Sequence, residues 1–255
     1  MLTCSKCGAI RRRDAQPAHY ESDRYDSTLL RHLYSRYRAA FERKRIHYGP
    51  LLAPNAEVLE VGSHVGAFLE TAESWGWKPT GLDIGWETSA FARHQGARVK
   101  RIALADYSPK LKRPDAVFVW NCFEQLEDPQ QTLGEARRML TRHGLVVLRV
   151  PNGEFYRRHI AGGRRALQAL GYNNMLGFPY LNGYSMHSLE RLLRSANFEV
   201  IATFATSVLT PPYPEMNGRL TKEWRILRSD AEHTLATDSP WIEVVGRACS
   251  SGRNA

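Results

Sequence analysis

The stretch that decides the fold runs from Val58 to Leu69 and reads VLEVGSHVGAFL. Its apolar, β-branched beginning predicts a buried strand, and a glycine turn leads from it into a helix-like segment. A second apolar run reaches Gly81 and Leu82 and is followed by an acid, Asp83, which lies 21 residues after Gly62. Such a turn lets a ligand approach the backbone, and the acid can accept hydrogen bonds from both hydroxyls of a ribose. This order therefore suits an adenosine-containing ligand.

The glycine turn resembles that of class I S-adenosylmethionine (SAM)-dependent methyltransferases, whose pattern is Glu/Asp-x-Gly-x-Gly-x-Gly. Glu60 stands at the acid, Gly62 and Gly66 at the outer glycines, and His64 where the middle glycine is usual. The resemblance implies that Glu60 organises the turn and that Gly62, Ser63, His64 and Gly66 face the methionine part of SAM. Nicotinamide-dependent Rossmann enzymes share the strand, turn and acid, so a dinucleotide is the alternative ligand.

The resemblance also implies SAM-binding residues at other strand ends. Asp83 would bind the ribose, Ile84 would lie beside the adenine, and Leu104 would flank the adenine ring. Asn121 follows the fourth predicted strand, where the backbone meets SAM in relatives. These positions fit together because parallel strands present their carboxyl ends at one edge of the sheet.

Three further segments are similar, in the same order, to methyltransferases of the ubiquinone-biosynthesis and polysaccharide-associated type. They read NCFEQLEDP (121–129), LTRHGLVVLRVPN (140–152) and YSMHSLERLLRSANF (184–198). Gln125 stands where those relatives usually carry a histidine. Since an amide takes no proton near neutral pH, this position is not expected to act as a base.

Strand and helix patterns alternate along the chain, which predicts an α/β fold. We expect a Rossmann-like, seven-stranded, mostly parallel sheet, with the last strand antiparallel and helices on both faces. The predicted strands are 57–61, 79–83, 99–104, 115–120, 145–150, 198–206 and 241–248. The predicted helices are 27–47, with a break allowed, 66–75, 87–94, 130–140 and 188–196. Residues 1–50 would form an N-terminal segment, and residues 51–255 a methyltransferase domain with an insertion at about 153–184.

Methyl transfer from a sulfonium mainly requires alignment of the acceptor and exclusion of water. A hydroxyl or phenol acceptor also benefits from a base. His187 is the first candidate, followed by His159 and Glu124. The alternative to a catalytic role is structural. The histidines would then be surface or hydrogen-bonded residues, and Glu124 would be a helix-start residue stabilised by the positive end of the helix. No carboxylate cluster with metal-ligand spacing occurs, so no metal is expected.

The insertion is predicted to cap the methyl-donor site, because it combines aromatic residues with arginines. Arg157, Arg158, Arg164 and Arg165 would bind a phosphate or carboxylate on the acceptor, which makes an anionic acceptor one option. The alternative is a dimer contact, so both a monomer and a homodimer are compatible with the sequence.

The net charge of +9 over 255 residues indicates either solvated helix faces or attraction to an anionic partner. No zinc-finger, helix-turn-helix or RNA-recognition signature accompanies it, so nucleic acid is the less favoured partner. The chain has no apolar run of 18 residues and no secretory pattern at its start, from which a cytoplasmic location without a membrane partner is expected. Cys4 and Cys7, followed by Gly8, form half of a zinc knuckle, and His19 could supply one further ligand.

The leading hypothesis is a SAM-dependent methyltransferase of a small-molecule or sugar acceptor, expected to act at oxygen. One alternative is a nucleic-acid methyltransferase acting on RNA, suggested by the basic charge. Another is a SAM-binding protein without catalysis, suggested by His64 and Gln125.

Overall fold

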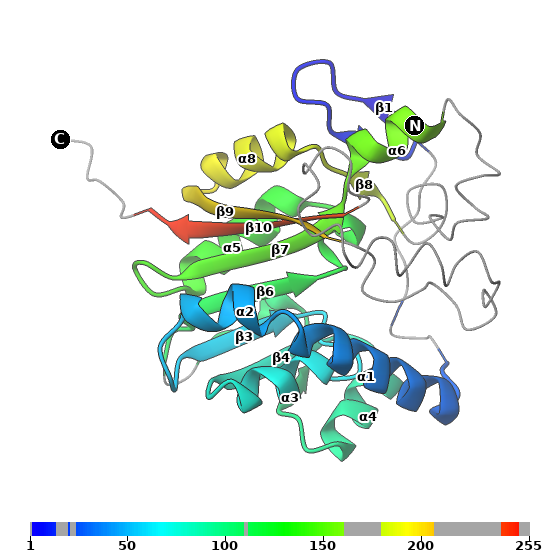
Figure 1. Cartoon of the computed structure of the whole chain (residues 1–255), viewed down its shortest axis with the longest axis vertical. Helices are drawn as coiled ribbons and strands as arrows, with labels where there is room; N and C mark the ends of the chain where they lie inside the picture. The colour runs from blue at the N-terminus through cyan, green and yellow to red at the C-terminus, as the bar shows by residue number, and fades with distance from the viewer. Residues whose placement is uncertain are drawn as a thin grey trace.

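The computed structural model describes residues 2–13, 20, 24–109, 112–160, 180–206 and 241–249, except for the side chains of 156, 158–160, 205 and 206. Its main element is a seven-stranded sheet with helices on both faces (Figure 1). The strand order is β5-β4-β3-β6-β7-β10-β9, and only β10 is antiparallel to its neighbours. The predicted fold class is confirmed.

The strands occupy nearly the predicted ranges: β3 (Glu57–Val61), β4 (Lys78–Asp83), β5 (Val99–Arg101), β6 (Ala116–Trp120), β7 (Leu145–Pro151), β9 (Phe198–Thr206) and β10 (Trp241–Ala248). β5 is shorter than predicted and is followed by a 3-10 turn at Leu104–Asp106. The reason is the register, in which Arg101 is paired with Asp83, the last residue of β4. Beyond that pair β5 has no partner strand.

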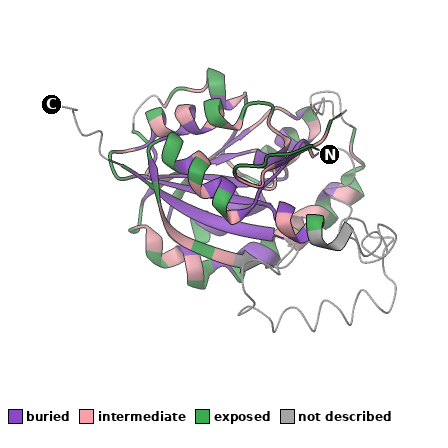
Figure 2. Ribbon diagram, turned by 90° about the horizontal axis from the view of Figure 1, so that it is seen from above, coloured by how far each residue is buried: buried purple, intermediate pink, exposed green. Residues whose placement is uncertain are grey.

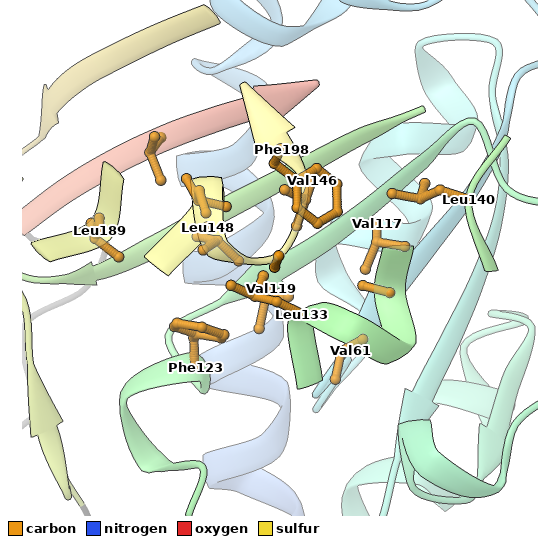
Figure 3. Close-up of a cluster of buried hydrophobic side chains, with 14 of the residues drawn as sticks. Val61, Val117, Val119, Phe123, Leu133, Leu140, Val146, Leu148, Leu189 and Phe198 are labelled. Atoms are coloured by element: carbon orange, nitrogen blue, oxygen red, sulfur yellow. The ribbon is translucent and has the colours of Figure 1, made fainter. Parts of the chain in front are cut away.

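Alternate side chains of the sheet enter two separate cores. Val117 and Val119 of β6 face the core under α5 (Pro129–Met139) and α8 (Met186–Ser195), part of which is drawn in Figure 3. Phe118 and Trp120 face the opposite core, under α1 (Ser27–Glu42), α2 (Arg45–Tyr48) and α3 (Ala67–Ser74). The strands are accordingly buried on both faces, as parallel strands with helical crossovers must be (Figure 2).

Local signals set the helix ends. The predicted helix over 27–47 is broken into α1 and α2, and Asp26 caps α1 by accepting from the backbone of Thr28. Asp128 caps α5, whose first residue is a proline. Ser185 and Ser188 form a capping box at the start of α8. The fourth helix, α4 (Trp86–His94), packs near the β5 edge through Ala92.

A small second sheet contains the N-terminal segment. It joins β1 (Leu2–Thr3), β2 (Ile10–Arg11) and β8 (Asn182–Gly183), and α6 (Gly153–Ile160) lies near it in Figure 1. The turn between β1 and β2 holds the two cysteines, and Ser185 donates a hydrogen bond of 2.8 Å to the carbonyl of Cys7. No helix in the described part of the chain is both long and apolar enough to span a bilayer.

Candidate active site

A cavity of about 630 Å³ lies at the carboxyl ends of β3, β4 and β6. Eight of the predicted SAM-binding residues line it: Glu60, Gly62, Ser63, His64, Asp83, Ile84, Leu104 and Asn121. They come together because β3 is hydrogen-bonded to β4 on one side and to β6 on the other. The ninth, Gly66, is not a lining residue. A Cβ at this position would lie 2.9 Å from that of Ala92, so Gly66 allows α3 to approach α4.

The turn after β3 has three residues in the left-handed region, with φ of 72° at Gly62, 47° at His64 and 76° at Gly66. A Cβ on Gly62 would lie 2.7 Å from the sulfur of Cys122, so a side chain is excluded there. Only His64 adopts this conformation at a steric cost. Its ring packs edge-on against Tyr25 at 5.8 Å and Tyr37 at 6.3 Å between centroids.

Asp83 holds the neighbouring loops as well as facing the cavity. Its carboxylate accepts from the backbone N–H of His64 (2.6 Å), from that of Gly85 (2.8 Å) and from the hydroxyl of Thr88 (2.9 Å). A carboxylate offers about four acceptor positions. One therefore remains for a ligand hydroxyl, rather than the two that binding of both ribose hydroxyls would need.

Two buried oxygen atoms of cavity-lining residues, Oε2 of Glu60 and Oγ of Ser63, have no hydrogen-bond partner among the described residues. Burial, and after it the charge of Asp83, raises the pKa of Glu60 well above its ordinary value. The protonated form is thereby favoured and can donate a hydrogen bond. Since unpartnered buried polar atoms are rare in folded proteins, this part of the wall fits a polar ligand group such as the methionine part of SAM.

The cavity is also lined by aromatic rings, those of Tyr20, Tyr25, Tyr37, Phe41, Phe68, Trp120 and Tyr180. Tyr20 donates a hydrogen bond to Oε1 of Gln125, and Nε2 of Gln125 donates to the carbonyl of Asn121 at 2.7 Å. Gln125, in the place of the usual histidine, thus joins Tyr20 to the end of β6.

The three candidate bases lie in different surroundings. His187 is exposed at the start of α8 and is not a lining residue. Glu124 is fully buried beside the cavity wall without lining it, and burial raises its pKa to about 8. His159 lies in α6, and its side chain is outside the described residues. Of the histidines whose side chains are described, His64 alone lines the cavity.

Two buried charged residues, Arg149 on β7 and Glu243 on β10, are not among the predicted site residues. Each is a charged residue inside an otherwise apolar strand run, a signal that could have identified them. The proposed cap lies largely outside the described residues, including Arg164 and Arg165 and the side chain of Arg158, while Arg157 is exposed.

No group of three metal-ligating side chains occurs among the described residues. Cys4 is exposed, and hydrogen bonds from the backbone of Lys6 and from Cys7 lower the pKa of its thiol. His19, the further ligand considered for a zinc site, lies outside the described residues.

Solved methyltransferase structures share this architecture. A SAM-dependent methyltransferase of Thermotoga maritima, described as a possible histamine N-methyltransferase, superposes with a TM-score of 0.56 and 16% identity over 86% of this chain and 94% of its own. The plantazolicin methyltransferase BpumL, bound to a substrate analogue and S-adenosylhomocysteine (SAH), superposes with a TM-score of 0.56 and 16% identity over 85% of each chain. Magnesium protoporphyrin IX methyltransferase of Synechocystis PCC 6803, also bound to SAH, superposes with a TM-score of 0.52 and 11% identity over 90% of each chain.

No curated protein sequence matches the chain. A family model described as a methyltransferase domain matches residues 24–203, from the residues before α1 into β9. The chain therefore belongs to the methyltransferase-domain family, and its predicted identification as a class I SAM-dependent methyltransferase is confirmed.

Proposed function

We propose that the protein transfers the methyl group of SAM to a small-molecule acceptor held by the aromatic residues of the cavity. The observation that carries this proposal is that one cavity is lined both by the unpartnered oxygen atoms of Glu60 and Ser63 and by several tyrosines. SAM would lie at Glu60 and Ser63, with its ribose at Asp83 and its adenine beside Ile84 and Leu104. Bound there, it supplies an electrophilic methyl group whose leaving group departs neutral.

The size and lining of the cavity support a small acceptor. A volume of about 630 Å³ lies within the range of roughly 300–1,000 Å³ that is typical of small-molecule sites. Tyr25 and Tyr37 come from residues in and before α1, and Tyr180 from the segment before β8, so two distant parts of the chain enclose the acceptor space. Aromatic walls exclude water, which methyl transfer requires, and favour an acceptor with a flat or apolar part.

Oxygen is the proposed acceptor atom, with a sugar as one possible source of the hydroxyl. A base would then take the proton. Of the predicted candidates, His187 is exposed outside the cavity and Glu124 is buried beside its wall, while the side chain of His159 is outside the described residues. His64 joins them because its ring lies on the cavity wall. A neutral imidazole is suited to this role near pH 7.

The proposal is tested by incubating the protein with methyl-labelled SAM and a cell extract separated into a small-molecule fraction and an RNA fraction. Label is expected in a small molecule other than SAM, formed together with SAH and only when the protein is present. Calorimetry with SAM, SAH and NAD accompanies this experiment, and binding of SAM and SAH but not NAD is expected.

The other outcomes would each contradict the proposal. Transfer of label to RNA, together with salt-sensitive RNA binding, would favour a nucleic-acid methyltransferase. Tight SAM binding without transfer to either fraction would favour a SAM-binding protein without catalysis. NAD binding without SAM binding would remove the methyl donor itself.

A further inference from the structure

A chain of polar side chains, buried except for the half-buried Asn121, connects α2 and the residue before it to the cavity. Lys44 and Tyr48 both donate hydrogen bonds to the carboxylate of Glu243. Arg149 lies directly opposite Glu243 on the neighbouring strand, with its Nε 3.2 Å from Oε1. Its Nη1 donates to Oδ1 of Asn121. Asn121 alone among these five residues lines the cavity.

The Arg149 side chain is fixed in one orientation by its contacts, so that it can in turn orient a neighbouring side chain. Its side chain is 1% exposed, and its guanidinium lies 4.1 Å from the ring centroid of Trp241. Charge pairing with Glu243 on one side and ring stacking on the other fix the plane of the guanidinium. Its position is therefore set by β10 rather than by solvent.

This arrangement fixes which way the Asn121 amide faces. A guanidinium has only donors, so the oxygen of the Asn121 amide must face Arg149 and the NH2 group must face away from it. The backbone of Asn121 is fixed as well, in the left-handed region at φ 55°. Its N–H donates to the carbonyl of Arg149 (3.3 Å), and its own carbonyl accepts from Gln125 (2.7 Å). Neither the amide nor the backbone is left to rotate.

We propose that Arg149 is a positioning residue, which acts through Asn121 to recognise the carboxylate at the amino-acid end of SAM. This inference rests on the proposed function. In the sheet, β3 lies between β4 and β6. If the ribose of SAM lies at Asp83 on β4 and the adenine lies toward β5, the rest of the ligand extends across β3 toward Asn121 after β6. That end of SAM is the amino-acid end, which carries a carboxylate. The Nδ2 donors of Asn121 then bind an oxygen of that carboxylate.

The test uses calorimetry with two ligands, SAH and 5′-methylthioadenosine, which lacks the amino-acid end. Asn121→Ala should weaken SAH binding about tenfold or more, the scale of a lost hydrogen bond to a charged group, and change methylthioadenosine binding less than about twofold. Arg149→Met should likewise weaken SAH binding and leave methylthioadenosine binding nearly unchanged. Because Arg149 acts through Asn121, adding Arg149→Met to Asn121→Ala should weaken SAH binding by no more than about a further twofold.

Two more variants separate positioning from folding. Asn121→Asp keeps an acceptor for Arg149, so the fold should be retained, while its charge repels the carboxylate. It should bind SAH more weakly than Asn121→Ala and bind methylthioadenosine normally. Arg149→Lys, which restores a donor, should recover part of the SAH affinity lost in Arg149→Met. Arg194→Met, at an exposed pair on α8, is the arginine control and should leave both affinities unchanged.

Equal losses for the two ligands, additive effects of Arg149→Met and Asn121→Ala, or unchanged SAH binding in Asn121→Asp would overturn the proposal. If the unmodified protein bound neither ligand, the proposed function itself would fail. These outcomes are distinct, since the first three arise only in a protein that binds SAH.

Discussion

The backbone N–H of His64 donates a hydrogen bond of 2.6 Å to Oδ2 of Asp83, which links the glycine turn after β3 to the end of β4. The acid expected to bind the ribose therefore also fixes the turn expected to hold the methionine part of SAM. One carboxylate thus couples the two halves of the predicted cofactor site.

Replacing Asp83 with alanine should weaken the binding of SAM and SAH by about 1–3 kcal/mol, the scale of a lost charge-assisted partner. The variant should also be less stable, because the donors on His64, Gly85 and Thr88 lose their acceptor. Calorimetry and denaturant unfolding measure the two effects. Asp106→Ala, at an exposed acid outside the cavity wall, is the control and should change neither. Unchanged SAH binding in Asp83→Ala would remove Asp83 from the site.

His64 offers a test of the left-handed turn. His64→Gly and His64→Ala both remove the ring that packs against Tyr25 and Tyr37, but only glycine adopts φ 47° without steric cost. His64→Gly should therefore be more stable than His64→Ala by about 1–2 kcal/mol. Urea unfolding of the two variants gives this difference directly. Equal stabilities would mean that the turn relaxes when the ring is removed.

Glu124 should make stability depend on pH. Burial raises its pKa from 4.5 to about 8, so the folded protein keeps a proton that the unfolded chain loses above about pH 4.5. Its stabilising contribution is fully present below pH 4.5 and is lost as the pH rises to about 8, by roughly 1.4 kcal/mol per unit.

Glu124→Gln removes this titration while keeping the shape of the side chain. Between pH 6 and pH 8 the unmodified protein should therefore lose about 2–3 kcal/mol more stability than the variant. Urea unfolding at the two pH values is the measurement, and parallel losses would show that Glu124 is already ionised at pH 6. The same variant tests the base, since undiminished methyl transfer would exclude Glu124 from that role.

Glu243 should be among the most sensitive positions of the fold. Although burial alone raises the pKa of its carboxyl, the charges of Lys44 and Arg149 outweigh this effect and lower the pKa. Glu243→Gln removes the negative charge between two buried cations and should cost about 3–5 kcal/mol of unfolding free energy. Glu190→Gln, which breaks an exposed pair with Arg194, should cost under about 1 kcal/mol. Similar costs for both variants would contradict a buried network.

Much of the fold could be predicted because its signals are local. The apolar runs, the glycines at 62 and 66 and the acid at 83 occur within 26 residues, and they predict two strands, a turn and their shared edge. The capping residues Asp128 and Ser185 likewise act on the helix that follows each of them. The small sheet of β1, β2 and β8 could not be predicted in this way, because β2 pairs with a strand near residue 182.

The sequence by itself determined the alternation of strands and helices, the glycine turn after β3 and the residues that follow the strand ends, since each depends on neighbours a few positions away. Only the tertiary structure decided that Arg149 faces Glu243, that both are fixed by α2 and Trp241, and that His187 lies outside the cavity while His64 lines it. The physical reason is the order and register of the strands. β10 inserts between β7 and β9, and that pairing brings together charges that are far apart in the chain.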